Sequence, residues 1–165
     1  MNLKHVLVGL LLVGLVGALG FLAYHFVVLT PDACGICGRP AHAEHYSRVE
    51  LRSGRGIRAC CPRCALHYRM NMAGKIERVL VADNSSGRLI DARNAAYVEG
   101  SDLEPCTRAA ENAPREPGVD YAREFDRCLP SLIAFGDESA AREFQLRHGG
   151  HVFTYAQAEE SVRRR

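Results

Sequence analysis

Apolar positions are spread unevenly along the chain and are densest near its N-terminus. Residues 6–29 read VLVGLLLVGLVGALGFLAYHFVVL and contain no Asp, Glu, Lys or Arg. A helix of about 20 apolar residues crosses the hydrocarbon core of a bilayer, so we predict that residues 1–29 form a single-pass transmembrane anchor. Lys4 precedes the stretch and favours an orientation that places the rest of the chain outside the cytoplasm. A cleaved signal peptide is the alternative, although its apolar region normally runs only about 7–15 residues.

Beyond residue 30 the pattern changes to short alternating segments, which are typical of strands. Pro62 is suited to open a helix, because its missing N–H costs little in the first turn. Asp137 is suited to cap a second helix, which Gly149 and Gly150 would end. The expected elements are strands over 46–51 and 57–59, a helix over 62–72, strands over 76–82, 88–91, 95–99 and 132–135, a helix over 138–147 and a final strand over 151–155.

These elements predict an α+β fold in which the N-terminal helix is followed by two small β-β-α-β halves. We place the first half, which is rich in cysteine, at residues 30–87 and the second half at residues 88–165. A loop over residues 107–120 interrupts the second half. A loop of that length inside a compact domain is usually functional or mobile.

The composition gives no indication of a nucleic-acid partner and includes seven cysteines. The 165 residues include 21 basic and 19 acidic side chains, a net charge of +2, so nothing indicates binding to nucleic acid. All seven cysteines follow residue 30. An odd number leaves at least one thiol unpaired within the chain, and free thiols outside the cytoplasm need a reason to persist.

Two C-x2-C pairs have the spacing of a metal site. The first pair, Cys34 and Cys37, is followed by Gly38, which lets the backbone curl and point N–H groups at sulfur. The second pair, Cys61 and Cys64, lies where a strand is expected to lead into a helix, and a helix N-terminus stabilises thiolates. A knuckle, a hairpin and a helix N-terminus together form a treble-clef-like site for one soft ion, either Zn²⁺ or Cu⁺.

Other assignments of these residues remain open. Cys60 and Cys64 are four residues apart and could converge on the ion in place of Cys61 and Cys64. His67, three residues beyond Cys64, could replace a thiolate. The cluster could instead form two disulfides, or one C-x2-C pair could be a redox site of the thioredoxin type.

Cys106 and Cys128 bracket the long loop and have no C-x2-C partners. A disulfide between them would close a loop of 21 intervening residues and stabilise the fold by about 3 kcal/mol in the chain-entropy description. The alternative is a second soft-metal site. No set of residues in the sequence suggests a hydrolytic or phosphate-binding site.

The second half resembles a known family. Residues 91–102 read DARNAAYVEGSD, and residues 130–135, 140–144 and 148–150 read PSLIAF, AAREF and HGG. These motifs resemble those of NosL-type proteins, the copper lipoproteins that assist nitrous oxide reductase, over about residues 76–155. The resemblance implies two β-β-α-β halves and extracytoplasmic binding or delivery of Cu(I). The chain departs from the family in having an apolar N-terminal segment in place of a lipid-modified Cys, Arg39 where the family has Met, and additional cysteines.

We therefore expect a cysteine-rich relative of the NosL type. It would be a membrane-anchored protein of the periplasmic side that binds a metal and is not an enzyme. Its partners would be the membrane, through the N-terminal helix, and a protein partner or metal acceptor. Two other functions stay open: a structural zinc module that engages a partner, and a thiol-disulfide oxidoreductase.

Overall fold

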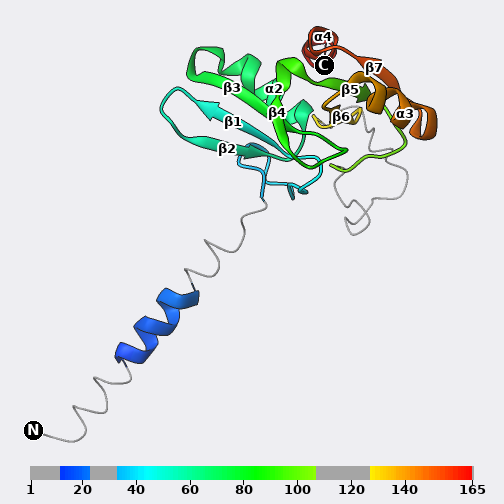
Figure 1. Ribbon diagram of the computed structural model, residues 1–165. Helices are drawn as coiled ribbons and strands as arrows, with labels where there is room; N and C mark the ends of the chain where they lie inside the picture. Colours follow the sequence, from blue (N-terminus) through cyan, green and yellow to red (C-terminus); the bar gives the residue numbers. More distant parts are fainter. Residues whose placement is uncertain (1–11, 23–32, 107–126, 165) are drawn as a thin grey trace, which may run out of the picture. The chain divides into compact units, whose positions relative to one another are not determined.

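A computed structural model describes residues 12–22, 33–106 and 127–164 (Figure 1). The chain divides into two units, Met1–Pro31 and Asp32–Arg165, which are described separately. In the first unit, residues 12–22 are helical and all of them are exposed, among them Leu12, Val16 and Phe21. Within the described residues, no helix combines the length and the apolar character needed to cross a membrane. The remainder of the predicted anchor, residues 1–11 and 23–29, lies outside them.

The second unit begins with a four-stranded antiparallel sheet of order β2-β1-β3-β4. Its strands are β1 (Ser47–Leu51), β2 (Gly56–Ala59), β3 (Ile76–Ala82) and β4 (Leu89–Asp91). Val49 of the central strand β1 lies opposite Ile57 on one side and Val79 on the other. The side chains of Val49, Val79 and Val81 are buried, which explains the fixed register of this sheet.

Helix α2 (Pro62–Asn71) packs against β1 and β3 and is followed by the short helix η1 (Ala73–Lys75). Pro62 occupies the first turn, and the Cys61 sulfur accepts a hydrogen bond from the backbone N–H of Cys64, so that Cys61 is the N-cap. The N-terminal half of α2 is fully buried, whereas its later residues are half-buried or exposed. The start of α2 therefore lies inside the core.

A three-stranded antiparallel sheet of order β6-β5-β7 follows. It contains β5 (Ala96–Glu99), β6 (Leu132–Phe135) and β7 (His151–Phe153), and the short helix η2 (Ala92–Asn94) precedes it. Helix α3 (Glu138–His148) packs against all three strands, and Phe144 contacts Phe135 with ring centroids 5.1 Å apart. The chain ends in α4 (Tyr155–Arg163).

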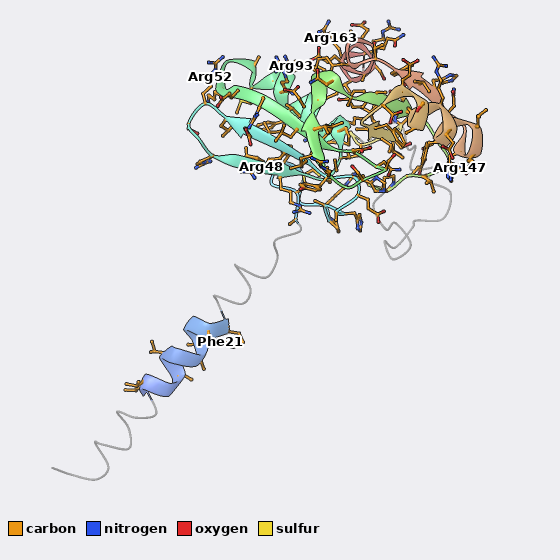
Figure 2. The ribbon with its side chains drawn as sticks, in the orientation of Figure 1. Phe21, Arg48, Arg52, Arg93, Arg147 and Arg163 are labelled. Carbon is orange, nitrogen blue, oxygen red and sulfur yellow. The ribbon has the colours of Figure 1, made fainter. Side chains whose placement is uncertain are left out.

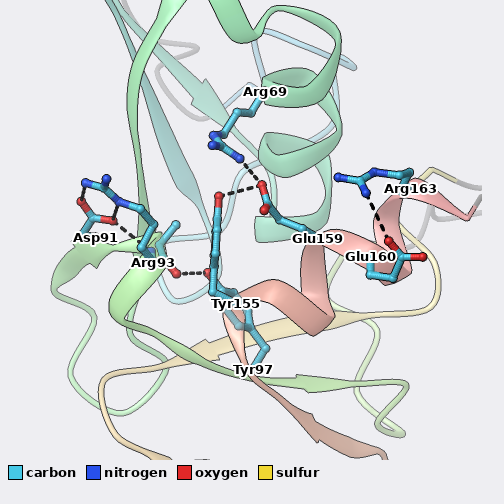
Figure 3. A network of polar contacts seen from close by, with 9 residues as sticks. Arg69, Asp91, Arg93, Tyr97, Tyr155, Glu159, Glu160 and Arg163 are labelled. Atoms are coloured by element: carbon cyan, nitrogen blue, oxygen red, sulfur yellow. Dashed lines mark hydrogen bonds and ion pairs between the residues drawn. The ribbon is translucent and has the colours of Figure 1, made fainter.

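Polar contacts join α4 to α2, and β5 to the short helix η2 (Figure 3). The hydroxyl of Tyr155 donates to Glu159 over 2.8 Å, and Glu159 also pairs with Arg69 of α2. The hydroxyl of the buried Tyr97 donates to the carbonyl of Ala92 over 2.6 Å. Figure 2 shows that the arginines labelled there lie apart on the surface of this unit, on several different elements: Arg48, Arg52, Arg93, Arg147 and Arg163.

Most predicted elements occur where expected. The predicted strands over 76–82 and 132–135 are confirmed to the residue, and Asp137 caps α3 by accepting from the N–H of Ala140 over 2.9 Å. The predicted division at residue 88 does not separate the two sheets, because β4 pairs with β3 and so belongs to the first sheet. The strand predicted over 151–155 was too long, because α4 begins at Tyr155 and was not predicted.

The two sheets share the larger of two apolar cores, and the smaller core lies between the second sheet and α3. The larger core includes Val49 and Val81 from the first sheet, Leu132 from the second, and Ala158 from α4. The buried cysteines belong to the same cluster. The predicted loop over 107–120 lies outside the described residues.

Candidate metal centre

The first arm of the site is a tight knuckle. The backbone N–H groups of Ile36 and Cys37 both point at the Cys34 sulfur, each 3.4 Å from it. Gly38 has a φ of +74°, a left-handed conformation that favours glycine, and its N–H donates to the Cys34 carbonyl over 2.9 Å. This turn returns the chain so that Cys34 and Cys37 face the same way, with two backbone N–H groups directed at the Cys34 sulfur.

The second arm is the junction of β2 and α2. Cys60 follows the last residue of β2, Cys61 caps α2, and Cys64 lies in the first turn of the helix. All three are buried, with exposed fractions of 0%, 3% and 0%. A knuckle, a hairpin and a helix N-terminus thus lie in the arrangement expected from the spacing of the cysteines.

Four sulfur atoms converge from these two arms. Those of Cys34, Cys37, Cys60 and Cys64 all lie within 4.8 Å of one another. Cys37 and Cys60 are 3.5 Å apart, and Cys34 and Cys64 are 3.9 Å apart. Four thiolates around one tetrahedral ion with bonds of about 2.3 Å would be separated by about 3.8 Å. A disulfide needs about 2.05 Å, so the sulfurs have the spacing of a metal site.

The structure therefore brings together three of the four expected ligands, and the fourth sulfur comes from Cys60, the alternative to Cys61. Cys34, Cys37 and Cys64 lie in the four-sulfur group, and Cys60 takes the place expected of Cys61. Cys61 itself has extended backbone, with φ −157° and ψ 164°. Neighbouring side chains on extended backbone point in opposite directions, so only one of the two adjacent cysteines can face the knuckle.

A second group of sulfurs adjoins the first. Those of Cys60, Cys61 and Cys128 also lie within 4.8 Å of one another, with Cys60 3.9 Å from Cys61 and 3.7 Å from Cys128. Cys106 lies beside them, and its thiol donates to the carbonyl of Cys60 over 3.2 Å. The seven cysteines, all of them among the described residues, form no disulfide with one another, so the expected bond between Cys106 and Cys128 is absent.

The sequence did not indicate that Cys106 and Cys128 adjoin the C-x2-C pairs. Cys128 lies 64 residues after Cys64, and no spacing rule connects them. His67, the other alternative ligand, belongs to neither group of potential ligands among the described residues. Its Nδ1 lies 3.1 Å from the side-chain amide of Asn71 on the same helix.

The thiols change one another's pKa. Hydrogen bonds from the thiols of Cys106 and Cys128 lower the pKa of Cys60. A hydrogen bond from Cys106 also lowers the pKa of Cys128, to about 4. Hydrogen bonds to neighbouring thiols of the cluster raise the pKa of Cys61, Cys64 and Cys106, and burial raises the pKa of Cys37 to about 12. Cys60 and Cys128 therefore lose their protons more readily than Cys61, Cys64 and Cys106, and a metal that binds these thiols must displace their protons.

The cluster is largely buried and is held in place by polar contacts. Only Cys37 is half-exposed, whereas the other six cysteines are buried. Arg39 donates to the Cys106 carbonyl over 2.9 Å. Arg63, which lies between Cys61 and Cys64 in sequence, is 1% exposed, pairs with Glu99, and donates to the Pro130 carbonyl over 2.8 Å. These contacts tie the segments around Cys106 and Cys128 to the rest of the site.

This donor set fits a soft metal ion. Sulfur is its only ligand type, and soft thiolates select Cu(I) and zinc over hard cations such as Mg²⁺ or Ca²⁺. Fold and site together define an α+β protein with a buried cluster of thiols that could hold metal.

Comparisons with known proteins identify a fold neighbour. The sequence matches no model of a known protein family, and no curated protein is significantly similar to it. Among solved structures, the fold is similar to that of the copper chaperone NosL from Shewanella denitrificans, with a TM-score of 0.55. The match covers 76% of this chain and 88% of that chain at 15% sequence identity. The chain therefore has a NosL-like fold, which agrees with the resemblance seen in its motifs.

Proposed function

We propose that this protein binds Cu(I) at its cysteine cluster and passes it to an acceptor, without catalysing a reaction. The observation that carries the proposal is the convergence of four thiols from the knuckle and the start of α2 within 4.8 Å. Cys34, Cys37, Cys60 and Cys64 would hold the ion as thiolates, each releasing its proton to solvent.

Two features favour copper as the cargo. The cluster offers more thiols than the four that one structural zinc ion uses, since Cys61, Cys106 and Cys128 adjoin it. The solved structure that shares the fold belongs to a copper chaperone.

Exchange of the ion requires access to the cluster, and the partial exposure of Cys37 supports such access. Cys37 is the half-exposed member of the four-sulfur group. An open cleft of about 350 Å³ lies beside Pro105, the residue before Cys106, and is lined also by residues 42–45. An acceptor thiol that approaches Cys37 could displace it without unfolding the buried part of the site.

The location of the protein is part of the proposal. Residues 1–29 would anchor it in the cell membrane, with residues 32–165 on the periplasmic side. The support is the uncharged apolar stretch over residues 6–29 and the preceding Lys4. Cleavage of intact and opened spheroplasts by an added protease tests this: the unit should be cut in both, and protection in intact spheroplasts would contradict it.

A structural zinc site is the second candidate, because the knuckle and helix N-terminus have the arrangement of a closed four-cysteine zinc site. Zinc would be needed for folding, so its removal would unfold the unit. Bound Cu(I) that serves as cargo should leave without loss of the fold.

The test is an anaerobic competition between the full-length protein and a chromophoric Cu(I) chelator. We expect the protein to withdraw Cu(I) from the chelator, the C34S and C64S variants to lose at least about tenfold in affinity, and H67Q to match the wild type. Circular dichroism should show the same fold with and without copper. Failure to compete for Cu(I), together with unfolding when zinc is chelated, would overturn the copper proposal.

A further inference from the structure

Cys60 occupies a special position among the cysteines, because its sulfur belongs to both groups of potential ligands. It lies within 4.8 Å of the sulfurs of Cys34, Cys37 and Cys64, and equally within 4.8 Å of those of Cys61 and Cys128. Its side chain is fully buried. The two groups therefore meet at one sulfur atom in the interior of the protein.

One ion does not account for both groups. A tetrahedral ion uses four sulfurs, and the first group already supplies them. The three sulfurs of the second group have the spacing of a separate, three-coordinate site. Three thiolates bonded to one ion at about 2.3 Å lie about 4.0 Å apart, and Cys60 lies 3.9 Å from Cys61 and 3.7 Å from Cys128.

The number and type of ligands in the second group favour Cu(I) over zinc. Structural zinc is almost always four-coordinate, and the second group supplies three thiols. Cu(I) is a soft ion that thiolates select. A thiolate sulfur keeps lone pairs after it has bound one cation, so it can bind a second, and a shared Cys60 would hold the two ions side by side.

We infer that the cluster binds two Cu(I) ions bridged by the thiolate of Cys60. The first ion is bound by Cys34, Cys37, Cys60 and Cys64, and the second by Cys60, Cys61 and Cys128. This inference rests on the proposed function, since it takes Cu(I) as the cargo. Each thiol that becomes a ligand loses its proton to solvent, and neither copper nor sulfur changes oxidation state.

The second ion would link parts of the chain that are distant in sequence. Cys61 caps α2, whereas Cys128 lies shortly before β6 of the other sheet. Loading of the second site would thus join the helix that carries the first site to the second sheet. Cys106 is not a member of the second group, and its thiol donates to the Cys60 carbonyl over 3.2 Å.

The direct test uses the reduced full-length protein, titrated with Cu(I) without air and followed by native mass spectrometry. We expect saturation at two copper ions per chain. X-ray absorption at the copper edge should show sulfur neighbours and a copper–copper vector, which only closely bridged ions produce. Saturation at one copper, or two coppers without that vector, would overturn the inference while leaving copper binding intact. Absence of copper binding would instead overturn the proposed function.

Two variants locate the bridge. C60S should abolish the copper–copper vector, because serine is a poor bridge between soft ions. C106S/C128S should saturate at one copper per chain instead of two, because the second group loses its donor from the distant segment. H67Q, which alters a His outside both groups, is the matched control and should still bind two. A copper–copper vector retained in C60S would contradict the assigned bridge. If C60S fails to fold, the copper–copper vector of the wild type and the copper content of C106S/C128S still test whether two bridged ions bind.

Discussion

Replacement of Arg63 by methionine should destabilise the fold strongly, because the Arg63 guanidinium is buried and joins several elements. The guanidinium is buried, with a side chain 2% exposed, and pairs with Glu99, whose side chain is 13% exposed. It also donates to the Pro130 carbonyl over 2.8 Å and to the Ser161 hydroxyl over 3.1 Å. These contacts join α2 to β5, to α4 and to the segment before β6.

Removal of the guanidinium leaves the Glu99 carboxylate in the interior without its cation. Breaking a buried ion pair in this way costs about 3–5 kcal/mol, which is a large part of the about 5–15 kcal/mol that stabilises a typical domain. R63M should therefore shift the folding equilibrium by more than about 100-fold toward the unfolded state. Urea unfolding of the reduced full-length protein in mild detergent, followed by far-UV circular dichroism, measures the change.

Two further variants test the physical reason. R142M removes the same charge from an exposed pair on α3, where Arg142 and Glu138 are 64% and 62% exposed, and should change stability by at most about 0.5 kcal/mol. R63M/E99M removes both buried charges and should be less destabilised than the sum of the two single variants. If R63M lies within about 1 kcal/mol of the wild type, the reasoning about the buried pair is refuted.

Three other predictions concern the second sheet, α4 and the cleft. G150A should destabilise the fold far more than G149A, measured by urea unfolding. Both glycines have positive φ, but a Cβ at Gly150 would lie 2.6 Å from the Glu99 carbonyl oxygen, whereas a Cβ at Gly149 would meet nothing within 4 Å. Equal losses of stability in G150A and G149A would contradict this steric explanation. T154A removes the capping box of α4 and should cost about 1 kcal/mol in the same assay, and an unchanged midpoint would show that the cap is dispensable. Burial lowers the pKa of His45 from its ordinary 6.5, so that only the unfolded chain takes up the proton near that pH. The free energy of unfolding should accordingly fall as the pH drops below about 6.5, and H45F should weaken that dependence; an identical pH profile in H45F would exclude this cause.

The elements that could be predicted from sequence are those with strong local signals. The run IERVLVA alternates and is rich in β-branched residues, and it forms β3 over the same residues. Asp137 and Gly149 bound α3 as a cap and a stop that act through adjacent backbone groups. The knuckle at Cys34 likewise has a local signal, since the N–H groups of Ile36 and Cys37 and the positive φ of Gly38 shape it.

Other features depend on contacts between residues distant in sequence. The pairing of β4 with β3 is not readable from three residues, because either sheet could accept so short a strand. The four-sulfur group includes Cys60 because the backbone direction at the start of α2 decides which of two adjacent cysteines faces the knuckle. Cys128 joins the second group through the packing of the two sheets, for which the sequence carries no spacing signal.

One missed element did have a local signal. Thr154 and Gln157 form a capping box, and Ala158 and Val162 are four residues apart and buried. Together they indicate a helix at the C-terminus. The prediction extended the preceding strand through Tyr155 instead, because an aromatic residue after His-Val-Phe-Thr continues a strand-like pattern.

Exchangeable Cu(I) in the cysteine cluster can be tested by the metal content and free-thiol count of the full-length protein, purified without air and without added metal. We expect copper, seven reduced cysteines, and removal of the copper by a chelator without a change in circular dichroism. One zinc ion per chain whose removal unfolds the protein would contradict this expectation, as would a protein without metal in which six of the seven cysteines are oxidised.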